Sequence, residues 1–241
     1  MSSKKVELKL DWCSYEAAKY ACEHWHYSKS TPVPPLVKIG VWENKKYIGC
    51  VIFSRGASSN LLKPYGLEQT EGCELTRVAL SKHSASVTKI ISIAIKLLKK
   101  ENPKLRLIVS FADPQYGHNG GIYQGGNWLY CGETAKSKEY WHNGKRLHSR
   151  QVSEKGWNIQ HGAKRKTIKP SDCQIINTKG KYRYLMPLDK EMAKQIESLR
   201  KPYPKKTSGG GVTVAQPAIQ QERGGSIPTS PQTLSQGFTN G

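Results

Sequence analysis

The segment CELTRVALSKHSASVTKIISIAIKLLKKENPKLRLIVSFAD, residues 73–113, holds the pattern that decides the fold. Residues 73–80 and 105–112 are predicted strands, and the second is apolar with little alternation, which is typical of parallel or central strands. Between them, apolar residues recur at helical spacing with lysines opposite, and Ser84 or Ser86 can cap that helix. This order of elements predicts a right-handed βαβ unit with parallel strands.

The sequence on either side adds further elements to this unit. Residues 14–26 predict a helix that Ser14 can cap. Residues 36–43 and 47–54 predict a β-hairpin around a short Asn-Lys-Lys turn. Later elements are expected as strands near 128–133, 138–142 and 182–186, and as a final helix at 189–199. The order predicts an α/β (α+β) fold with a mixed sheet.

The last part of the chain has a different composition. Residues 207–241 are rich in Gly, Ser, Thr, Gln and Pro and contain one aromatic residue, Phe238. Such a segment buries too little surface to offset the entropy of ordering it. We therefore expect one folded domain, residues 1–206, followed by a disordered C-terminal tail, residues 207–241.

The charge of the chain indicates the kind of partner. There are 38 Lys and Arg against 18 Asp and Glu, a formal net charge of +20, and all of it lies in residues 1–206. Such a density is most simply tolerated beside a polyanion, and nucleic acid is the first candidate. A basic protein without such a partner is the alternative. In the second half, basic residues alternate with aromatics that can stack a base, in three groups: Trp141, His142, Lys145 and Arg146; Trp157 and Lys164–Lys166; Lys179, Lys181, Tyr182 and Arg183.

Two further properties bear on the compartment. The chain has no apolar run long enough for a transmembrane helix and no apolar signal segment at its start, so we expect no membrane association. The six cysteines are scattered without a Cys-x-x-Cys pair, which favours reduced thiols in a cytoplasm.

The strongest candidate site follows the strand at 105–112. Ligands of βαβ units favour the carboxyl ends of the strands, and here that end is Asp113 within FADPQYGHNGGIYQGGNW, residues 111–128. Gly120 and Gly121 permit close backbone approach, and His118 titrates near neutrality. On spacing alone, a glycine-rich Asp-Pro turn is also a common loop.

Two other clusters contain polar residues that could take part in catalysis or binding. His24 and His26 lie where the first helix ends, and on a regular helix they diverge. Arg77 lies on the strand at 73–80, where regular alternation places it on the same face as Leu75 and calls for a partner or ligand. A metal site of His24, His26, Asp113 and His118 is conceivable as a His/carboxylate set, although no tight ligand spacing supports it.

Several blocks of the sequence occur together in a known family. They are HYS (26–28), VKIGVWE (37–43), FSRGA (53–57), KPYGLEQTEGCELTRVAL (63–80), LIVSFADPQYGHNGGIYQGGNWLYCG (107–132), RYLMPLD (183–189) and KPYPK (201–205). With these blocks in order, the chain resembles the phage Mom family of DNA modification proteins over most of residues 10–206.

The resemblance implies a GNAT acetyltransferase-like fold with a mostly antiparallel sheet. It implies conversion of adenine in double-stranded phage DNA to N6-(carbamoylmethyl)adenine, in the cytoplasm of the infected host, as protection against restriction enzymes. Residues that match those implicated in the family are Tyr27, Arg77, Asp113 and Tyr123. The resemblance also implies acetyl-CoA and iron as cofactors.

Roles for these residues follow as hypotheses. Asp113 would accept a proton from, or hydrogen-bond to, the amino group of a flipped adenine, and Arg77 would hold an anionic donor. Tyr27 and Tyr123 would orient or stack on the base. His26 and His118 would ligate a metal or act as acid and base. Donor or substrate contacts are expected from Ser28, Lys82, Ser84, Gly120 and Gly121.

The sequence departs from an ordinary acetyltransferase in one motif. Acetyltransferases of this fold hold the CoA pyrophosphate on a glycine-containing turn before a helix, whereas the turn at 80–84 has no glycine. The carbamoylmethyl product also joins N6 through a methylene, which attack on a thioester does not give. Acetylation of a small-molecule or protein amine, and nucleic-acid binding without catalysis, are the two alternative functions.

Overall fold

The computed structural model describes residues 6–205 except residues 57, 148 and 161. The tail predicted at 207–241 lies outside the described residues, so that prediction and the boundary at 206 stay predictions. Among the helices of the described part, none is long and apolar enough to cross a membrane.

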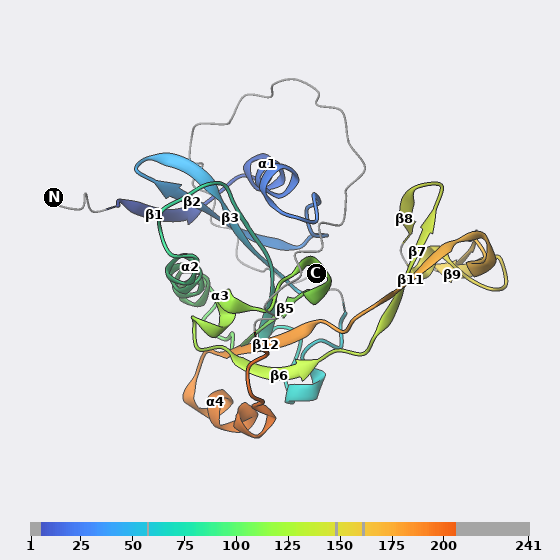
Figure 1. Cartoon of the computed structure of the whole chain (residues 1–241). Coiled ribbons are helices and arrows are strands. Elements are labelled where there is room, and N and C mark those ends of the chain that lie inside the picture. Colours follow the sequence, from blue (N-terminus) through green and yellow to red (C-terminus); the bar gives the residue numbers. More distant parts are fainter. Residues whose placement is uncertain (1–5, 57, 148, 161, 206–241) are drawn as a thin grey trace.

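A seven-stranded sheet in the order β1-β2-β3-β4-β5-β12-β6 forms the body of the protein (Figure 1). These strands are β1 (Leu8–Trp12), β2 (Leu36–Glu43), β3 (Lys46–Ser54), β4 (Gly72–Leu80), β5 (Leu107–Ala112), β6 (Leu129–Glu133) and β12 (Tyr182–Pro187). Only β4 and β5 pair in parallel; the other neighbours are antiparallel. The predicted mixed sheet, mostly antiparallel, is therefore confirmed, and β1 adds a strand that the sequence did not indicate.

Four α-helices and five short 3-10 helices accompany the strands in the described residues. They are α1 (Tyr15–Trp25), α2 (Val87–Glu101), α3 (Gly121–Gln124), α4 (Lys190–Ile196), η1 (Lys63–Tyr65), η2 (Pro114–Tyr116), η3 (Ser149–Gln151), η4 (Pro170–Asp172) and η5 (Glu197–Leu199). The predicted cap of α1 is confirmed, because Oγ of Ser14 accepts the N–H of Ala17 at 3.2 Å. The helix expected at 189–199 is divided into α4 and η5.

Helices cover both faces of the sheet, and β3 shows how the sequence achieves this. Val51 and Phe53 belong to the core cluster that contains α2, whereas Cys50 and Ile52 pack with α1. Because both faces of β3 are buried, its sequence is apolar throughout instead of alternating. A third cluster packs α4 against β5, β6 and β12, and α1 and α4 lie at opposite ends of the sheet, at the top and bottom of Figure 1.

Strands β4 and β5 pair over only part of their length. Their parallel register runs from Gly72↔Leu107 to Leu75↔Ser110 and then stops, although β4 continues to Leu80. At the same point the register between β3 and β4 shifts, which leaves Thr76 as an extra residue. A bulge of this kind bends a strand and interrupts its alternation. The regular alternation that we expected from Leu75 to Arg77 is therefore wrong, and a gap opens between the two central strands.

Between β6 and β12 the chain makes a long excursion, residues 137–178, which we call the arm. It contains β7 (Ser137–His142), β8 (Lys145–Leu147), β9 (Trp157–Gln160), β10 (Ala163–Lys166) and β11 (Gln174–Thr178), in a three-stranded and a two-stranded sheet. The arm projects away from the body (Figure 1). At its root the N–H of Thr134 donates to the carbonyl of Lys181, and the N–H of Lys181 donates to Oγ of Thr134, each at 2.9 Å. The arm is thus an insertion into the β6–β12 hairpin.

Candidate active site

A cavity of about 560 Å³ occupies the gap between β4 and β5. Three segments line it: the end of α1, the part of β4 beyond the bulge, and the stretch from the end of β5 to α3. The lining residues are Trp25, His26, Tyr27, Thr76, Arg77, Val78, Phe111, Ala112, Asp113, Gly117, His118, Asn119, Gly120, Gly121, Ile122 and Tyr123. Eight predicted site residues, far apart in the sequence, therefore line one cavity: His26, Tyr27, Arg77, Asp113, His118, Gly120, Gly121 and Tyr123.

Asp113 is a nearly buried carboxylate at the carboxyl end of β5, with 8% of its surface exposed. One carboxylate oxygen lies 3.3 Å from Nζ of Lys181, and the other accepts the N–H of Gln115 at 3.1 Å. An ionised carboxylate has about four lone-pair sites, so these two contacts leave acceptor capacity for a ligand. The pairing fixes the orientation of the carboxylate and leaves oxygen lone pairs that can accept a hydrogen bond.

The loop after Asp113 is fastened to the sheet by Tyr184. The hydroxyl of Tyr184 donates to the carbonyl of Asn119 at 2.6 Å and accepts from Nε2 of Gln124 at 3.1 Å. Gly120 has φ +80°, and a Cβ there would lie 2.3 Å from the ring of Tyr184. The loop therefore needs glycine at 120 for both its backbone conformation and its contact with Tyr184.

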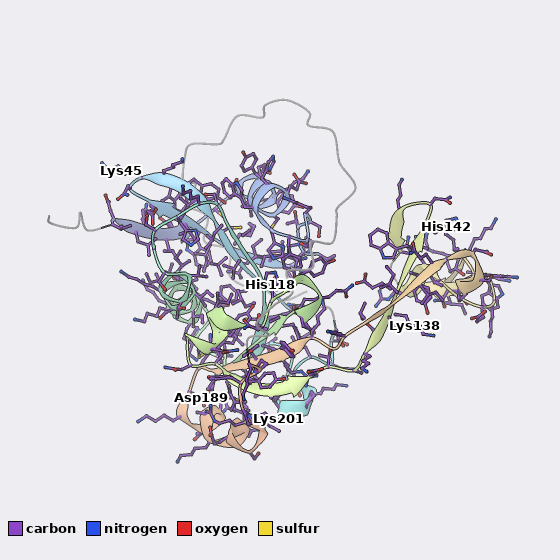
Figure 2. All side chains as sticks on the ribbon, in the orientation of Figure 1. Lys45, His118, Lys138, His142, Asp189 and Lys201 are labelled. Atoms are coloured by element: carbon purple, nitrogen blue, oxygen red, sulfur yellow. The ribbon has the colours of Figure 1, made fainter. Side chains whose placement is uncertain are left out.

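Tyr27 lies within a group of aromatic rings beside the cavity. Its ring centroid is 4.3 Å from that of His26, 4.8 Å from that of Tyr116 and 4.9 Å from that of His118. His118 lies near the centre of the molecule (Figure 2). Burial lowers the pKa of His118, and the charge of Asp113 opposes that effect. Rings spaced in this way provide a surface on which a planar base can stack.

His26 is held in one protonation state by its neighbour. The N–H of Ser28 donates to Nδ1 of His26 at 3.1 Å, and the hydroxyl of Ser28 lies 2.8 Å from the same nitrogen. A nitrogen that accepts an N–H carries no proton, so the neutral ring carries its proton on Nε2. Burial and, next, the charge of Arg77 lower the pKa of His26 to about 3. At neutral pH His26 is therefore an uncharged donor at Nε2.

Arg77 brings a positive charge to the cavity. Its Nη1 donates to the carbonyl of Thr76 at 2.8 Å and its Nε to the carbonyl of Ser30 at 3.3 Å. Guanidinium has further N–H donors beyond these two. The side chain is thus fixed by the backbone and still presents a charge that can bind an anionic or polar group.

Tyr123 lines the cavity but directs its hydroxyl into the core. Its hydroxyl lies 2.7 Å from Oγ of Ser110, which in turn lies 2.8 Å from the carbonyl of Leu75. Because the carbonyl can only accept, Ser110 donates to it and accepts from Tyr123. Burial raises the pKa of Tyr123 to about 12. This series of hydrogen bonds connects α3 to the point where the pairing of β4 and β5 ends.

Lys82 and Ser84 lie outside the lining of the cavity, near the start of α2. There the N–H groups of Ser84 and Ala85 donate to the carboxylate of Glu43, at 3.0 Å and 2.7 Å. Two amides of the turn before α2 are therefore occupied by the protein's own carboxylate, which puts a negative charge where a CoA pyrophosphate would bind. This turn therefore fits the pyrophosphate of acetyl-CoA poorly.

The His/carboxylate metal site that the sequence raised as a possibility does not form in the structure. Within residues 6–205, outside the three positions that are not described, no group of three His, Cys, Asp or Glu side chains is placed to hold a metal ion. His26 cannot ligate through Nε2 while that nitrogen carries the proton. The structure therefore does not support an iron site formed by His26 and His118.

Three functional contacts were not foreseen from the sequence. Lys181, which pairs with Asp113, follows the arm and lies 68 residues later in the chain. Tyr116 adds a ring beside Tyr27, and Tyr184 anchors the loop. Tyr184 had a usable signal, since a predicted strand with a tyrosine at a fully buried position needs a partner for the hydroxyl. The pairing of Lys181 had none, because it depends on the path of the arm.

Parallel strands that part around a polar cavity, within an otherwise antiparallel sheet, define a mixed α+β protein. The chain belongs to the Mom protein family, whose family model matches residues 7–205. It is similar to the methylcarbamoylase Mom of Escherichia phage Mu, with 24% identity over 208 residues that cover 83% of this chain and 84% of the relative.

The solved structures that the chain resembles at low identity include two acetyltransferases. One is an acetyltransferase of Bacillus subtilis in complex with CoA, with 12% identity, a TM-score of 0.43 and coverage of 77% of this chain and 100% of that one. Another is a putative acetyltransferase of Acinetobacter baylyi, with 10% identity, a TM-score of 0.42 and coverage of 78% and 95%.

Proposed function

We propose that the protein is a transferase that converts adenine in phage DNA to N6-(carbamoylmethyl)adenine and so protects the DNA from host restriction. Membership of the Mom family and the similarity to a methylcarbamoylase support this proposal. The observation that carries it is the nearly buried carboxylate of Asp113, which lines one cavity with Arg77 and the stacking ring of Tyr27.

The base would enter the cavity as a flipped nucleotide of double-stranded DNA. An enzyme that acts on a base inside a duplex must extrude it from the stack, and the cavity of about 560 Å³ has room for an adenine. Tyr27 and the neighbouring rings would stack on the base, while Tyr123 would support the wall through Ser110. Gly120 and Gly121 would allow the base to approach the backbone.

The reaction replaces one hydrogen of the adenine amino group. As N6 forms its bond to the methylene carbon of the donor, the bond from that carbon to the donor's leaving group breaks, and the leaving group departs with the bonding electrons. N6 loses a proton in the same exchange, and Asp113 would accept it. General-base catalysis of this kind contributes about 10²–10⁴ in rate. His26, as a neutral donor, and His118 would hydrogen-bond to the base or to the donor.

Arg77 would bind the donor through a polar or anionic group. Acetyl-CoA has less support as that donor, because Glu43 already takes the amides before α2. Acyl transfer would also join N6 to a carbonyl carbon and not to a methylene. For the same reasons the alternative function, acetylation of an amine, has less support. The setting of the reaction would be the cytoplasm of the infected bacterium.

Mass spectrometry of nucleosides tests this function. Plasmid DNA from cells that produce the wild-type protein should contain a deoxyadenosine that is heavier by one C₂H₃NO unit. Asp113→Asn preserves the shape of the side chain, and it should lower the yield by about 10²–10⁴ because the general base is lost. Glu101→Gln, at an exposed position of α2, is the control for loss of a carboxylate and should modify DNA normally. Unmodified adenine in the presence of soluble wild-type protein would refute the function.

A further inference from the structure

The arm carries a concentration of positive charge that the cavity does not explain. Residues 137–178 contain nine Lys and Arg against three Asp and Glu. All four residues of β10, Ala163–Lys166, are exposed. The charge therefore lies on the surface of a projecting element, where it is available to a partner.

The arm also contributes little to the stability of the body. Within the described residues, none of the three hydrophobic core clusters includes a side chain from residues 137–178. Ile159 and Ile175 are 64% and 41% exposed. A projecting element that adds no core and keeps apolar side chains in solvent is better explained by a binding role than by a structural one.

Strands β9 and β10 form a two-stranded ribbon with a defined basic face. Lys166 pairs with Trp157, and Lys164 pairs with Ile159. Directly paired residues share a face, and the Nζ of Lys164 lies 4.4 Å from the ring centroid of Trp157. One face therefore presents two lysines with an indole and an exposed Ile159, and Arg165 lies on the other. The major groove of B-DNA admits a two-stranded β-ribbon.

A basic path joins this ribbon to the cavity. Lys138 lies near the base of the arm and His142 farther out (Figure 2). At the root, Lys136, Lys179 and Lys181 are all exposed, and Lys181 pairs with Asp113 of the cavity. Six residues of β7 extend about 20 Å, a length comparable to half the pitch of a duplex, which is about 34 Å, so the arm is long enough to follow a duplex away from the cavity.

We propose that the arm is a DNA-binding clamp whose β9–β10 ribbon contacts the phosphates of the double-stranded DNA that carries the nucleotide in the cavity. This inference rests on the proposed function for its partner and names the surface that holds that partner. Lys164 and Lys166 contact phosphates, Trp157 with Ile159 packs against the groove, and Arg165 on the opposite face adds to the positive potential of the ribbon. The lysines at the root continue the contact toward the cavity.

The test compares two variants that lose the same charge. Lys164→Gln/Arg165→Gln/Lys166→Gln removes the basic residues of the ribbon. Lys89→Gln/Lys96→Gln/Lys100→Gln removes three exposed lysines of α2, which lies on the other side of the molecule from the arm (Figure 1). Binding of the full-length proteins to a fluorescent 20-bp duplex is measured by anisotropy at several salt concentrations, and circular dichroism confirms that each variant is folded.

The ribbon variant should bind at least ~10-fold more weakly at 0.15 M salt, and its log–log salt slope should fall by about 2–3, since each phosphate contact contributes about 0.9. The α2 variant should stay within about twofold of wild type. A charge-retaining variant, Lys164→Arg/Lys166→Arg, should bind like wild type, which separates lost charge from a disturbed ribbon. Equal losses in the two Gln variants, or no loss in the ribbon variant, would overturn the proposal, as would equally tight, ribbon-dependent binding of duplex RNA.

Nucleoside analysis of the same variants keeps the two proposals apart. The clamp is supported and the proposed reaction is refuted if the wild type binds DNA but leaves adenine unmodified, while the ribbon variant binds weakly. Modified adenine from wild type, together with a ribbon variant of normal affinity, supports the reaction and refutes the clamp.

Discussion

The body of the sheet and the arm are built on opposite principles. In β3 of the body, seven consecutive residues from Ile48 to Ser54 are buried, whereas in β10 of the arm every residue is exposed. The body gains its stability from apolar surface removed from water, and it holds the cavity in a rigid frame. The arm is held by strand pairing and carries charge. Chemistry and DNA contact can therefore be disrupted separately, and the following predictions test that separation.

The largest difference is expected between two isoleucines. Ile108 of β5 is fully buried, and Ile159 of the arm is 64% exposed. Ile108→Ala should lower the free energy of unfolding by about 2–5 kcal/mol, since it leaves a cavity in the core. Ile159→Ala should change it by less than about 0.5 kcal/mol. Urea unfolding of both variants measures the difference, and similar losses would show that the arm shares the core of the body.

A smaller difference is expected between two glycines of the loop at the cavity. Gly117 and Gly120 both have positive φ, but a Cβ at Gly117 meets no atom within 4 Å, whereas at Gly120 it meets the ring of Tyr184. Gly117→Ala should cost about 1–2 kcal/mol from its backbone conformation alone. Gly120→Ala adds overpacking of about 1–3 kcal/mol and should also abolish DNA modification. Its affinity for duplex DNA should stay near wild type, because the arm is untouched.

Equal stability of these two alanine variants in urea unfolding would contradict the role of Tyr184 as the anchor of the loop. A Gly120→Ala protein that modifies DNA at the wild-type rate would show that the loop needs no close contact with the sheet.

The smallest effect is the loss of stability expected when the pH is lowered, and it comes from His26 in the body. The pKa of His26 falls to about 3 in the folded protein, below the ordinary value of 6.5. Between these values the unfolded chain binds a proton that the folded chain does not, so stability rises with pH across this window and is lost on acidification. From pH 7 to pH 5 the free energy of unfolding should fall by about 1–2 kcal/mol, with a contribution of the same sign from His118.

His26→Gln should flatten most of this slope, and urea unfolding at pH 7, 6 and 5 measures it. Carboxylates stabilised in the folded state contribute mainly below about pH 4, so they do not obscure the comparison. An unchanged slope in His26→Gln would contradict the low pKa of that ring.

The sequence predicts the body well and the arm poorly, for a physical reason. Elements such as β3 and α2 bury apolar residues, so periodicity reveals them. The strand AKRK at 163–166 buries nothing, and its pattern gives no signal of a strand. At the cavity, Asp113 was predicted because a buried strand ends there, and it does line the cavity. The bulge at Thr76 and the carboxylate of Glu43 before α2 were not foreseen, because each depends on a neighbouring strand that periodicity does not specify.

The root of the arm has a consequence for how such proteins diversify. Residues 134 and 181 are hydrogen-bonded to each other just beyond the ends of β6 and β12, so a segment of any length can be exchanged between them without moving the register of β6 or β12. Recombination at these two positions would replace one arm by another in a single event and leave the cavity intact. Two relatives with the same cavity would then differ only in the arm, the segment inserted in the β6–β12 hairpin. On the clamp proposal, they would also differ in the DNA that they bind.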